Sequence, residues 1–245
     1  MGIAHIEGSA DGPEGSRDPC HFSPWNAAAG PPLLPGMKRS TSTLFLLTLI
    51  GQAAWSLANA VWWHRSPGTD ALGLVLLTLF TVVAASGYRR WPIVAVRVVV
   101  GLEFLAVLAD RFGLLGGPGS PGVAWGDFAH FVSYTRQVTA FLPGGFALPL
   151  AVAATIAESG LAIALLTGIR SRPTAAATAA LLASYAVSMT LSMPLTQPLH
   201  YLVYPQAAGM LAIATRPGAV AGRARRPRDT GRAPSGRTGA PKLRP

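Results

Sequence analysis

Four of the ionisable residues within the apolar stretches of this sequence have side chains that could bind a polar ligand or exchange a proton. Arg97, Glu103 and Asp110 lie in one apolar stretch, and Glu158 lies in the next. A charge in apolar surroundings is costly unless it is paired, neutralised or in contact with water. Ionisable residues inside membrane segments are functional more often than not. We therefore treat these four residues as candidates for an intramembrane polar pocket that binds a small polar ligand, a quinone head group or a proton.

The spacing of these residues suggests how they could meet. Glu103 and Asp110 are seven residues apart and share one face of a helix. Counted from the expected inner ends of their helices, Glu103 and Glu158 both lie about 14 Å deep, and Arg97 about 6 Å deep. The alternative to a ligand pocket is an ion pair between Arg97 and Glu158 that only sets the helix register. The sequence leaves both interpretations open.

The composition indicates that membrane helices position these residues. The chain has 245 residues, of which 50% are hydrophobic and 12% charged, and its mean hydropathy is +0.39. Soluble domains carry about 25% charged residues, so lipid is the expected surrounding. Cys20 is the single cysteine, which excludes an intramolecular disulfide, a Cys-x-x-Cys redox pair and a thiolate metal cluster. No phosphate-binding loop or nucleophile elbow is present, and no cofactor-binding motif is evident.

Six apolar stretches approach the length needed to cross a hydrocarbon core of about 30 Å. They are Thr43–Trp63, Ala71–Gly87, Ile93–Leu114, Gly145–Thr167, Thr174–Met193 and Tyr201–Thr215. The last is short and contains Pro205, so we expect it to be tilted, kinked or extended upstream. We predict an all-α fold, a polytopic transmembrane helix bundle of about six spans.

Small residues at a spacing of four in the fifth stretch predict contacts between helices, since they allow close backbone approach. They are Ala176, Ala180, Ser184, Ser188 and Ser192. The segment Trp125–Leu142 combines aromatic residues near helical spacing with interspersed charges, so we predict an amphipathic helix at the outer interface. It could be a lid packed on the bundle or a gate to an internal cavity.

The two ends of the chain differ from the apolar stretches. Residues 1–36 are polar and rich in Gly and Pro, which predicts a disordered leader. The basic pair after Met37 is typical of a protein start, so a second hypothesis is that this leader is a gene-model extension. Residues 37–60 could instead be a cleaved signal, but the apolar stretch continues past the candidate cleavage site, which favours an uncleaved helix. Residues 217–245 predict a basic, disordered cytoplasmic tail that lies against anionic lipid.

The distribution of Lys and Arg predicts the orientation in the membrane. The expected inner side holds fifteen of these residues and the outer side three: Lys38, Arg39, Arg89, Arg90, Arg170, Arg172 and nine from Arg216 to Arg244 inside, and Arg65, Arg111 and Arg136 outside. Because positive residues in short loops face the cytoplasm, we predict a multi-pass cell-membrane protein with both termini cytoplasmic. The same alternation argues against nucleic-acid binding, despite the net charge of +10.

At these residues the sequence resembles the DoxX family of small bacterial and archaeal membrane proteins. The similar positions are Arg97, Gly101, Phe104 and Asp110-Arg111, then Trp125, Phe131 and Tyr134 before a Leu-Pro, and Glu158-Ser159-Gly160 with the run from Leu165 to Arg172. The resemblance implies a DoxX-like four-helix membrane domain at 89–216, preceded by two N-terminal transmembrane helices at 37–88. Two positions depart from the family pattern, because Leu108 stands where Gly is frequent and Glu103 where an apolar residue is usual.

The resemblance also implies a role. Family members look like accessory subunits of membrane redox complexes, linked to quinone in the oxidation of sulfur compounds or in oxidative-stress assemblies. We therefore expect a membrane subunit with redox-complex partners and quinone as the possible ligand, more often non-catalytic than a stand-alone enzyme. Arg97 and Glu158 are the polar residues that mark the family. The alternatives are a small proton- or solute-coupled carrier and a scaffold without a small-molecule site.

The predicted topology can be tested at the two ends of the second apolar stretch. Accessibility tags at His64 and Arg90 should report opposite sides of the membrane, because one helix separates them. Labelling with a membrane-impermeant reagent in intact cells and in inverted vesicles measures this. Two tags in the same compartment would contradict the topology.

Overall fold

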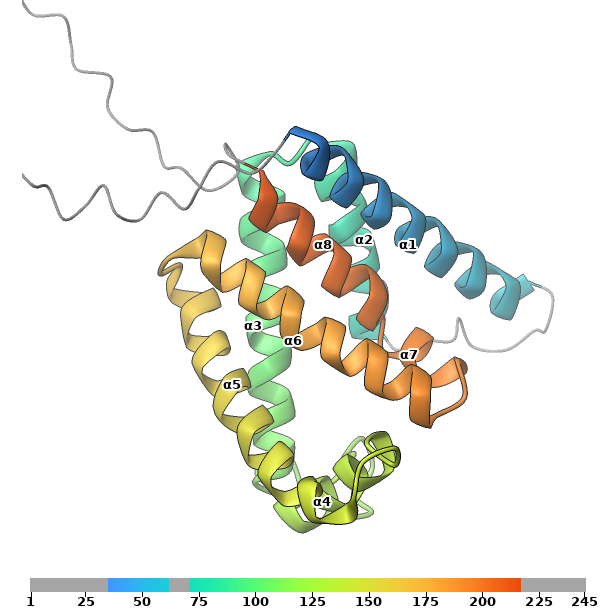
Figure 1. The fold of residues 1–245 in the computed structure, drawn as a ribbon, viewed down its shortest axis with the longest axis vertical. Helices are drawn as coiled ribbons and strands as arrows, with labels where there is room; N and C mark the ends of the chain where they lie inside the picture. Colours follow the sequence, from blue (N-terminus) through green and yellow to red (C-terminus); the bar gives the residue numbers. More distant parts are fainter. Residues whose placement is uncertain (1–34, 62–70, 217–245) are drawn as a thin grey trace, which may run out of the picture. The chain divides into compact units, whose positions relative to one another are not determined.

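The computed structural model describes residues 35–61 and 71–216, and these residues form an all-helical structure without a strand (Figure 1). The all-α prediction is therefore confirmed for the described part of the chain. The predicted leader lies outside the described residues apart from Pro35 and Gly36, which begin the first helix. The predicted basic tail at 217–245 also lies outside them.

The described helices are α1 (Pro35–Val61), α2 (Ala71–Ala85), α3 (Arg90–Arg111), α4 (Phe128–Val138), α5 (Ala147–Thr167), α6 (Ser171–Ser192), α7 (Thr196–His200) and α8 (Val203–Thr215). A 3-10 turn, Gly144–Phe146, leads into α5. Four of the described helices, α1, α3, α5 and α6, are long and apolar enough to cross a membrane. They indicate a multi-pass membrane protein. Because α2 has 15 residues and α8 has 13, the count of six spans remains a prediction.

Helix α8 is the most deeply buried helix, and it lies between α1 and α6 (Figure 1). The sixth apolar stretch is extended upstream by α7. The helix is interrupted at Leu202, whose φ of 52° lies in the left-handed region. Pro205 does not kink the helix, because it sits in the first turn of α8, where backbone N–H groups have no partner within the helix.

Close packing around α8 depends on one glycine. The rings of Phe45 from α1 and Phe80 from α2 pack edge to face, with centroids 5.7 Å apart, and both are fully buried. They lie against Gly209 of α8, where an added Cβ would come within 2.4 Å of Phe80 and 2.8 Å of Phe45. Gly209 therefore lets three helices meet, as small residues do in membrane proteins.

Polar contacts also join α1 to the C-terminal helices. The hydroxyls of Thr41 and Thr215 are 3.1 Å apart, and the Gln52 amide donates to the carbonyl of Leu199 at 3.0 Å. Arg216, directly after α8, donates to the Ser42 hydroxyl at 2.7 Å. These contacts make α1 part of the folded core, which favours a retained helix over a cleaved signal.

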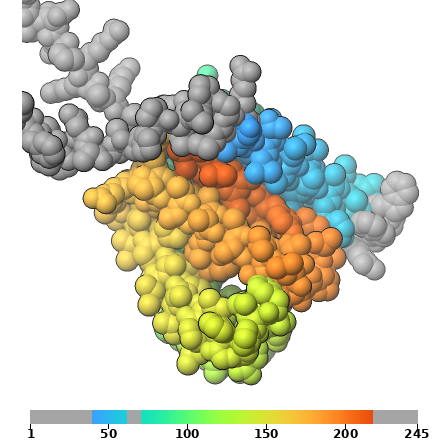
Figure 2. Space-filling view, viewed as in Figure 1, coloured from blue at the N-terminus to red at the C-terminus, as the bar shows by residue number. Residues whose placement is uncertain are grey.

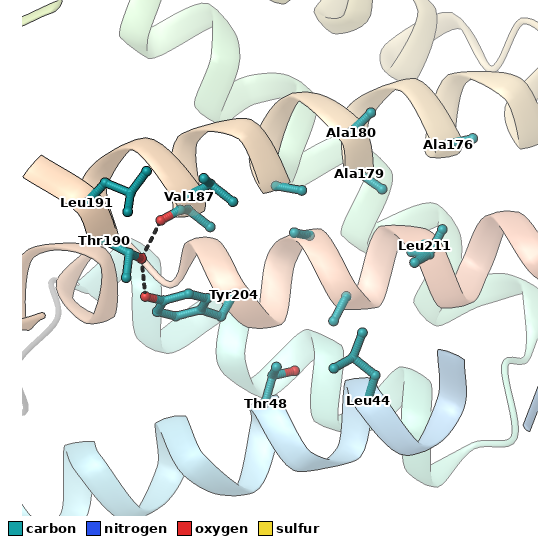
Figure 3. A pocket seen from close by; sticks show the side chains of 14 residues that line it. Leu44, Thr48, Ala176, Ala179, Ala180, Val187, Thr190, Leu191, Tyr204 and Leu211 are labelled. Carbon is teal, nitrogen blue, oxygen red and sulfur yellow. Dashed lines mark hydrogen bonds between the residues drawn. The ribbon is translucent and has the colours of Figure 1, made fainter. Parts of the chain in front are cut away.

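Two of the small residues of α6 that are predicted to make helix contacts, Ala176 and Ala180, are exposed. Helix α6 packs on α8 through a different face, which includes Ala175, Ala179 and Leu182. Ala176 and Ala180 instead line an open apolar groove between α1, α6 and α8 (Figure 3). A spacing of four marks a helix face but does not say whether that face is covered within the chain, so the helix contacts of these small residues remain a prediction.

Replacing Gly209 with Ala should destabilise the protein by about 1–3 kcal/mol, because the new methyl group would overlap two buried rings. The matched control is Gly51→Ala in α1, where no atom lies within 4 Å of the added Cβ. That change should be neutral or slightly stabilising, since Ala favours a helix over Gly. Thermal unfolding in detergent measures both variants. Equal stability of the two would contradict the packing described around α8.

Candidate functional site

The register between α3 and α5 decides which polar residues meet. A Cβ added at Gly101 of α3 would touch Leu165 and Leu166 of α5, and the Arg97 side chain reaches Gly168, just beyond α5. The helices therefore run antiparallel, with Arg97 beside the C-terminal end of α5. In this register Glu158 lies close to the C-terminal end of α3 and far from Arg97.

Glu158 forms a buried ion pair with Arg111, the last residue of α3. The Arg111 guanidinium lies 2.6 Å from Glu158 Oε2, and the two side chains are 3% and 2% exposed. The Tyr185 hydroxyl of α6 donates to Glu158 Oε1 at 2.5 Å, and Arg111 also donates to the Thr155 hydroxyl at 3.2 Å. Three helices thus supply one charge-neutral polar cluster in an apolar interior.

Aromatic rings cover the other side of Arg111. Its guanidinium carbon lies 3.6 Å from the ring centroid of Phe131 in α4 and 5.4 Å from that of Trp125. Such contacts are attractive because the face of an aromatic ring is negative. They fasten α4 over the ion pair, so the amphipathic segment is a lid packed on the bundle.

Asp110 holds the loop that leads into this lid. Its carboxylate accepts hydrogen bonds from the backbone N–H groups of Ala124 at 2.9 Å, Gly126 at 3.0 Å and Trp125 at 3.3 Å. Asp127 then caps α4 by accepting from the backbone N–H of His130, and this bond holds the pKa of the Asp127 carboxyl below its usual value. Asp110 therefore has a structural role and does not line the cavity beneath the lid.

Arg97 caps the C-terminal end of α5 and does not pair with Glu158. Its guanidinium donates to the carbonyl of Leu165 at 2.7 Å and to the Ser171 hydroxyl at 3.2 Å. Gly168 provides the space, because a Cβ there would lie 2.9 Å from the guanidinium. The Arg97–Glu158 ion pair considered from the sequence is wrong, since Arg111 is the partner of Glu158.

Glu103 of α3 has a partner on α8. The Gln206 side-chain amide donates to Glu103 Oε1 at 3.2 Å and to the carbonyl of Tyr201 at 3.3 Å. Glu103 and Glu158 line the same cavity, so the structure brings together two of the four candidate residues. The other two, Arg97 and Asp110, form bonds outside it.

The cavity has a volume of about 470 Å³ and is bounded by α3, α4, α5, α6 and α8. This volume is typical of small-molecule sites, as are apolar walls with a few polar groups. Its polar and aromatic lining includes Glu103, Arg111, Trp125, Phe131, Tyr134, Glu158, Tyr185 and Gln206. Figure 2 shows an opening in this face of the molecule between α4 and α6.

Three residues of the site escaped the sequence reasoning. Arg111 lies near the end of the third apolar stretch, where the count of positive residues places it on the outer side, although its position directly after Asp110 was a signal. Tyr185 is the only tyrosine of α6, but several serine and threonine hydroxyls lie in the same helix, so nothing in the sequence singled it out. No signal pointed to Gln206.

Replacing Arg111 should show how much the ion pair with Glu158 stabilises the fold. Arg111→Met should destabilise the protein by about 3–5 kcal/mol, because Glu158 would be left as a buried charge. Adding Glu158→Gln to this variant should recover part of the loss, since no charge then remains there. Arg136→Met changes an exposed arginine of α4 and is the control in thermal unfolding. If Arg111→Met costs no more than Arg136→Met, the pair does not stabilise the fold.

In comparisons with known proteins, no family model, curated protein or solved structure matches this chain. The DoxX resemblance accordingly remains a prediction. No group of three or more His, Cys, Asp or Glu side chains that could hold a metal ion occurs among residues 35–61 and 71–216.

Proposed function

We propose that this chain is a DoxX-like, multi-pass membrane subunit of a quinone-linked redox complex. In this proposal the cavity under α4 binds the quinone head group. The observation that carries the proposal is the buried cluster of Arg111, Glu158 and Tyr185 at the wall of an otherwise largely apolar and aromatic cavity.

The walls of the cavity match the chemistry of a quinone. A quinone head group is a flat apolar ring with oxygen atoms at its edge, so it needs aromatic or aliphatic walls and few polar groups. Trp125, Phe131 and Tyr134 supply rings that can stack on it or meet it edge to face. A polar substrate with many hydroxyl or charged groups would find few partners on these walls.

Arg111 is suited to hold a quinone carbonyl. A guanidinium has five N–H donors, and the bonds to Glu158 and Thr155 both use Nη1. The buried Nε has no hydrogen-bond partner among the described residues. Arg111 can therefore donate to a ligand oxygen while it remains paired with Glu158. Tyr185 and Glu158 provide a hydrogen-bonded route for a proton beside the same ligand.

Electrons in this proposal come from a redox-active partner subunit, as the family resemblance implies. The second candidate is a small proton- or solute-coupled carrier, favoured by the two carboxylates, Glu103 and Glu158, in one cavity. The quinone site is preferred because Arg111 already neutralises Glu158, which leaves the cluster without net charge for a substrate ion.

The proposal predicts that Tyr185→Phe lowers the affinity for decylubiquinone about three- to tenfold, because Glu158 loses its hydroxyl donor and the cluster is no longer held in place. Tyr204→Phe is the matched control, since this tyrosine bonds to Thr190 and lines the groove on the other side of α6. Binding is measured with the full chain in lipid nanodiscs. Glu158→Gln should also lower the affinity.

Two further outcomes separate the candidate functions. Co-purification of a redox partner with quinol-dependent turnover in mild detergent supports the quinone-linked subunit. Uptake driven by a pH gradient, measured with the isolated chain in liposomes, supports the carrier. If Glu158→Gln changes neither protein level nor quinone binding, Glu158 is not part of the site.

A further inference from the structure

Gln206 of α8 lies in the cavity wall, and the two ends of its side-chain amide have different surroundings. It is 1% exposed, and its side-chain nitrogen donates to Glu103 Oε1 and to the carbonyl of Tyr201. A backbone carbonyl can only accept a hydrogen bond, so the amide nitrogen of Gln206, and not its oxygen, faces Tyr201 and Glu103. Its oxygen, Oε1, is buried and has no hydrogen-bond donor among the described residues.

A buried acceptor without a donor costs free energy, which a suitable ligand would recover. We propose that Gln206 Oε1 accepts a hydrogen bond from a hydroxyl group of the ligand, so that the cavity binds hydroquinone more tightly than quinone. This inference rests on the proposed quinone site and adds to it a preference for one redox form.

The chemistry of the two redox forms explains the preference. Quinone oxygens only accept hydrogen bonds, so a quinone carbonyl would face Gln206 Oε1 without a proton between them. Each hydroxyl of a hydroquinone can donate one. Arg111 on the cavity wall can donate to the oxygen of either form, a carbonyl or a hydroxyl, so its donors do not select the hydroquinone. In this proposal the acceptor that selects the hydroquinone is Gln206 Oε1.

The preference has an electrochemical consequence. A ligand site that binds the reduced form more tightly raises the midpoint potential of the bound couple. For a two-electron couple, each tenfold difference in affinity corresponds to about 30 mV. The bound quinone would thus be a stronger oxidant than the free quinone.

The test compares three probes on the full chain in nanodiscs under anaerobic conditions. They are decylubiquinone, its hydroquinone, and the dimethyl ether of that hydroquinone, which has oxygens but no hydroxyl donors. The wild-type chain should bind the hydroquinone about tenfold more tightly than the quinone, the difference expected for one hydrogen bond to a buried acceptor. The dimethyl ether should bind no better than the quinone.

Gln206→Leu should abolish the preference, because it removes the acceptor while keeping a side chain of similar length. The hydroquinone affinity should fall to that of the quinone, whose affinity should not decrease. Gln52→Leu is the matched control, because Gln52 is also 1% exposed, donates to a backbone carbonyl and has a buried Oε1 without a donor among the described residues. It does not line the cavity, so its variant should keep the preference.

The outcomes separate this inference from the proposed function. Equal affinity of the wild-type chain for hydroquinone and quinone would overturn the inference and leave the quinone site standing. A preference lost equally in both glutamine variants would also overturn it, since packing would then be the cause. If none of the three probes binds, the quinone site and the inference both fail. If Gln206→Leu does not fold, equal affinities of the wild-type chain for hydroquinone and quinone still overturn the inference.

Discussion

The ion pair between Arg111 and Glu158 is the contact on which the arrangement of the candidate site depends. Two charges this deeply buried are tolerated only as a pair with further hydrogen bonds, because each alone would lack the solvation that water provides. Tyr185 and Thr155 supply those bonds, and the Phe131 ring covers the guanidinium. One pair therefore constrains α3, α4, α5 and α6 together, and the cavity is the space left beside it.

The sequence predicted the helices well and their register poorly. Hydropathy and length are local properties, so the long apolar helices could be found without knowledge of their neighbours. The need of Glu158 for a partner also followed from elementary electrostatics. The identity of the partner could not be deduced in the same way. Depths counted from the helix ends assume that α3 and α5 begin and end at the same level in the membrane. The close approach of Gly101 to Leu166 sets a different register, and Arg111 takes the place expected for Arg97.

Two other members of the site could not be predicted for a related reason. A tyrosine or a glutamine within an apolar helix is uncharged, so it does not require a charged partner as a carboxylate does, and its role depends on which helix face is covered. Helix α8 is buried almost all round, and no periodic pattern in its residues marks the side that meets the cavity. The exposed alanines of α6 show the same ambiguity, because Ala176 and Ala180 look like helix contacts and line an open groove instead.

The contacts that Arg111 makes with Phe131 and with Glu158 differ in strength. Moving α4 away would lose the contact between Arg111 and Phe131, which is worth about 0.5–2 kcal/mol. Separating Arg111 from Glu158 would cost about 3–5 kcal/mol, because a buried charge would be left alone. The contact to Phe131 is therefore the weaker of these two contacts of Arg111, and the ion pair is the stronger one. The polar cluster of Arg111, Glu158 and Tyr185 would accordingly stay assembled if the contact to Phe131 were lost.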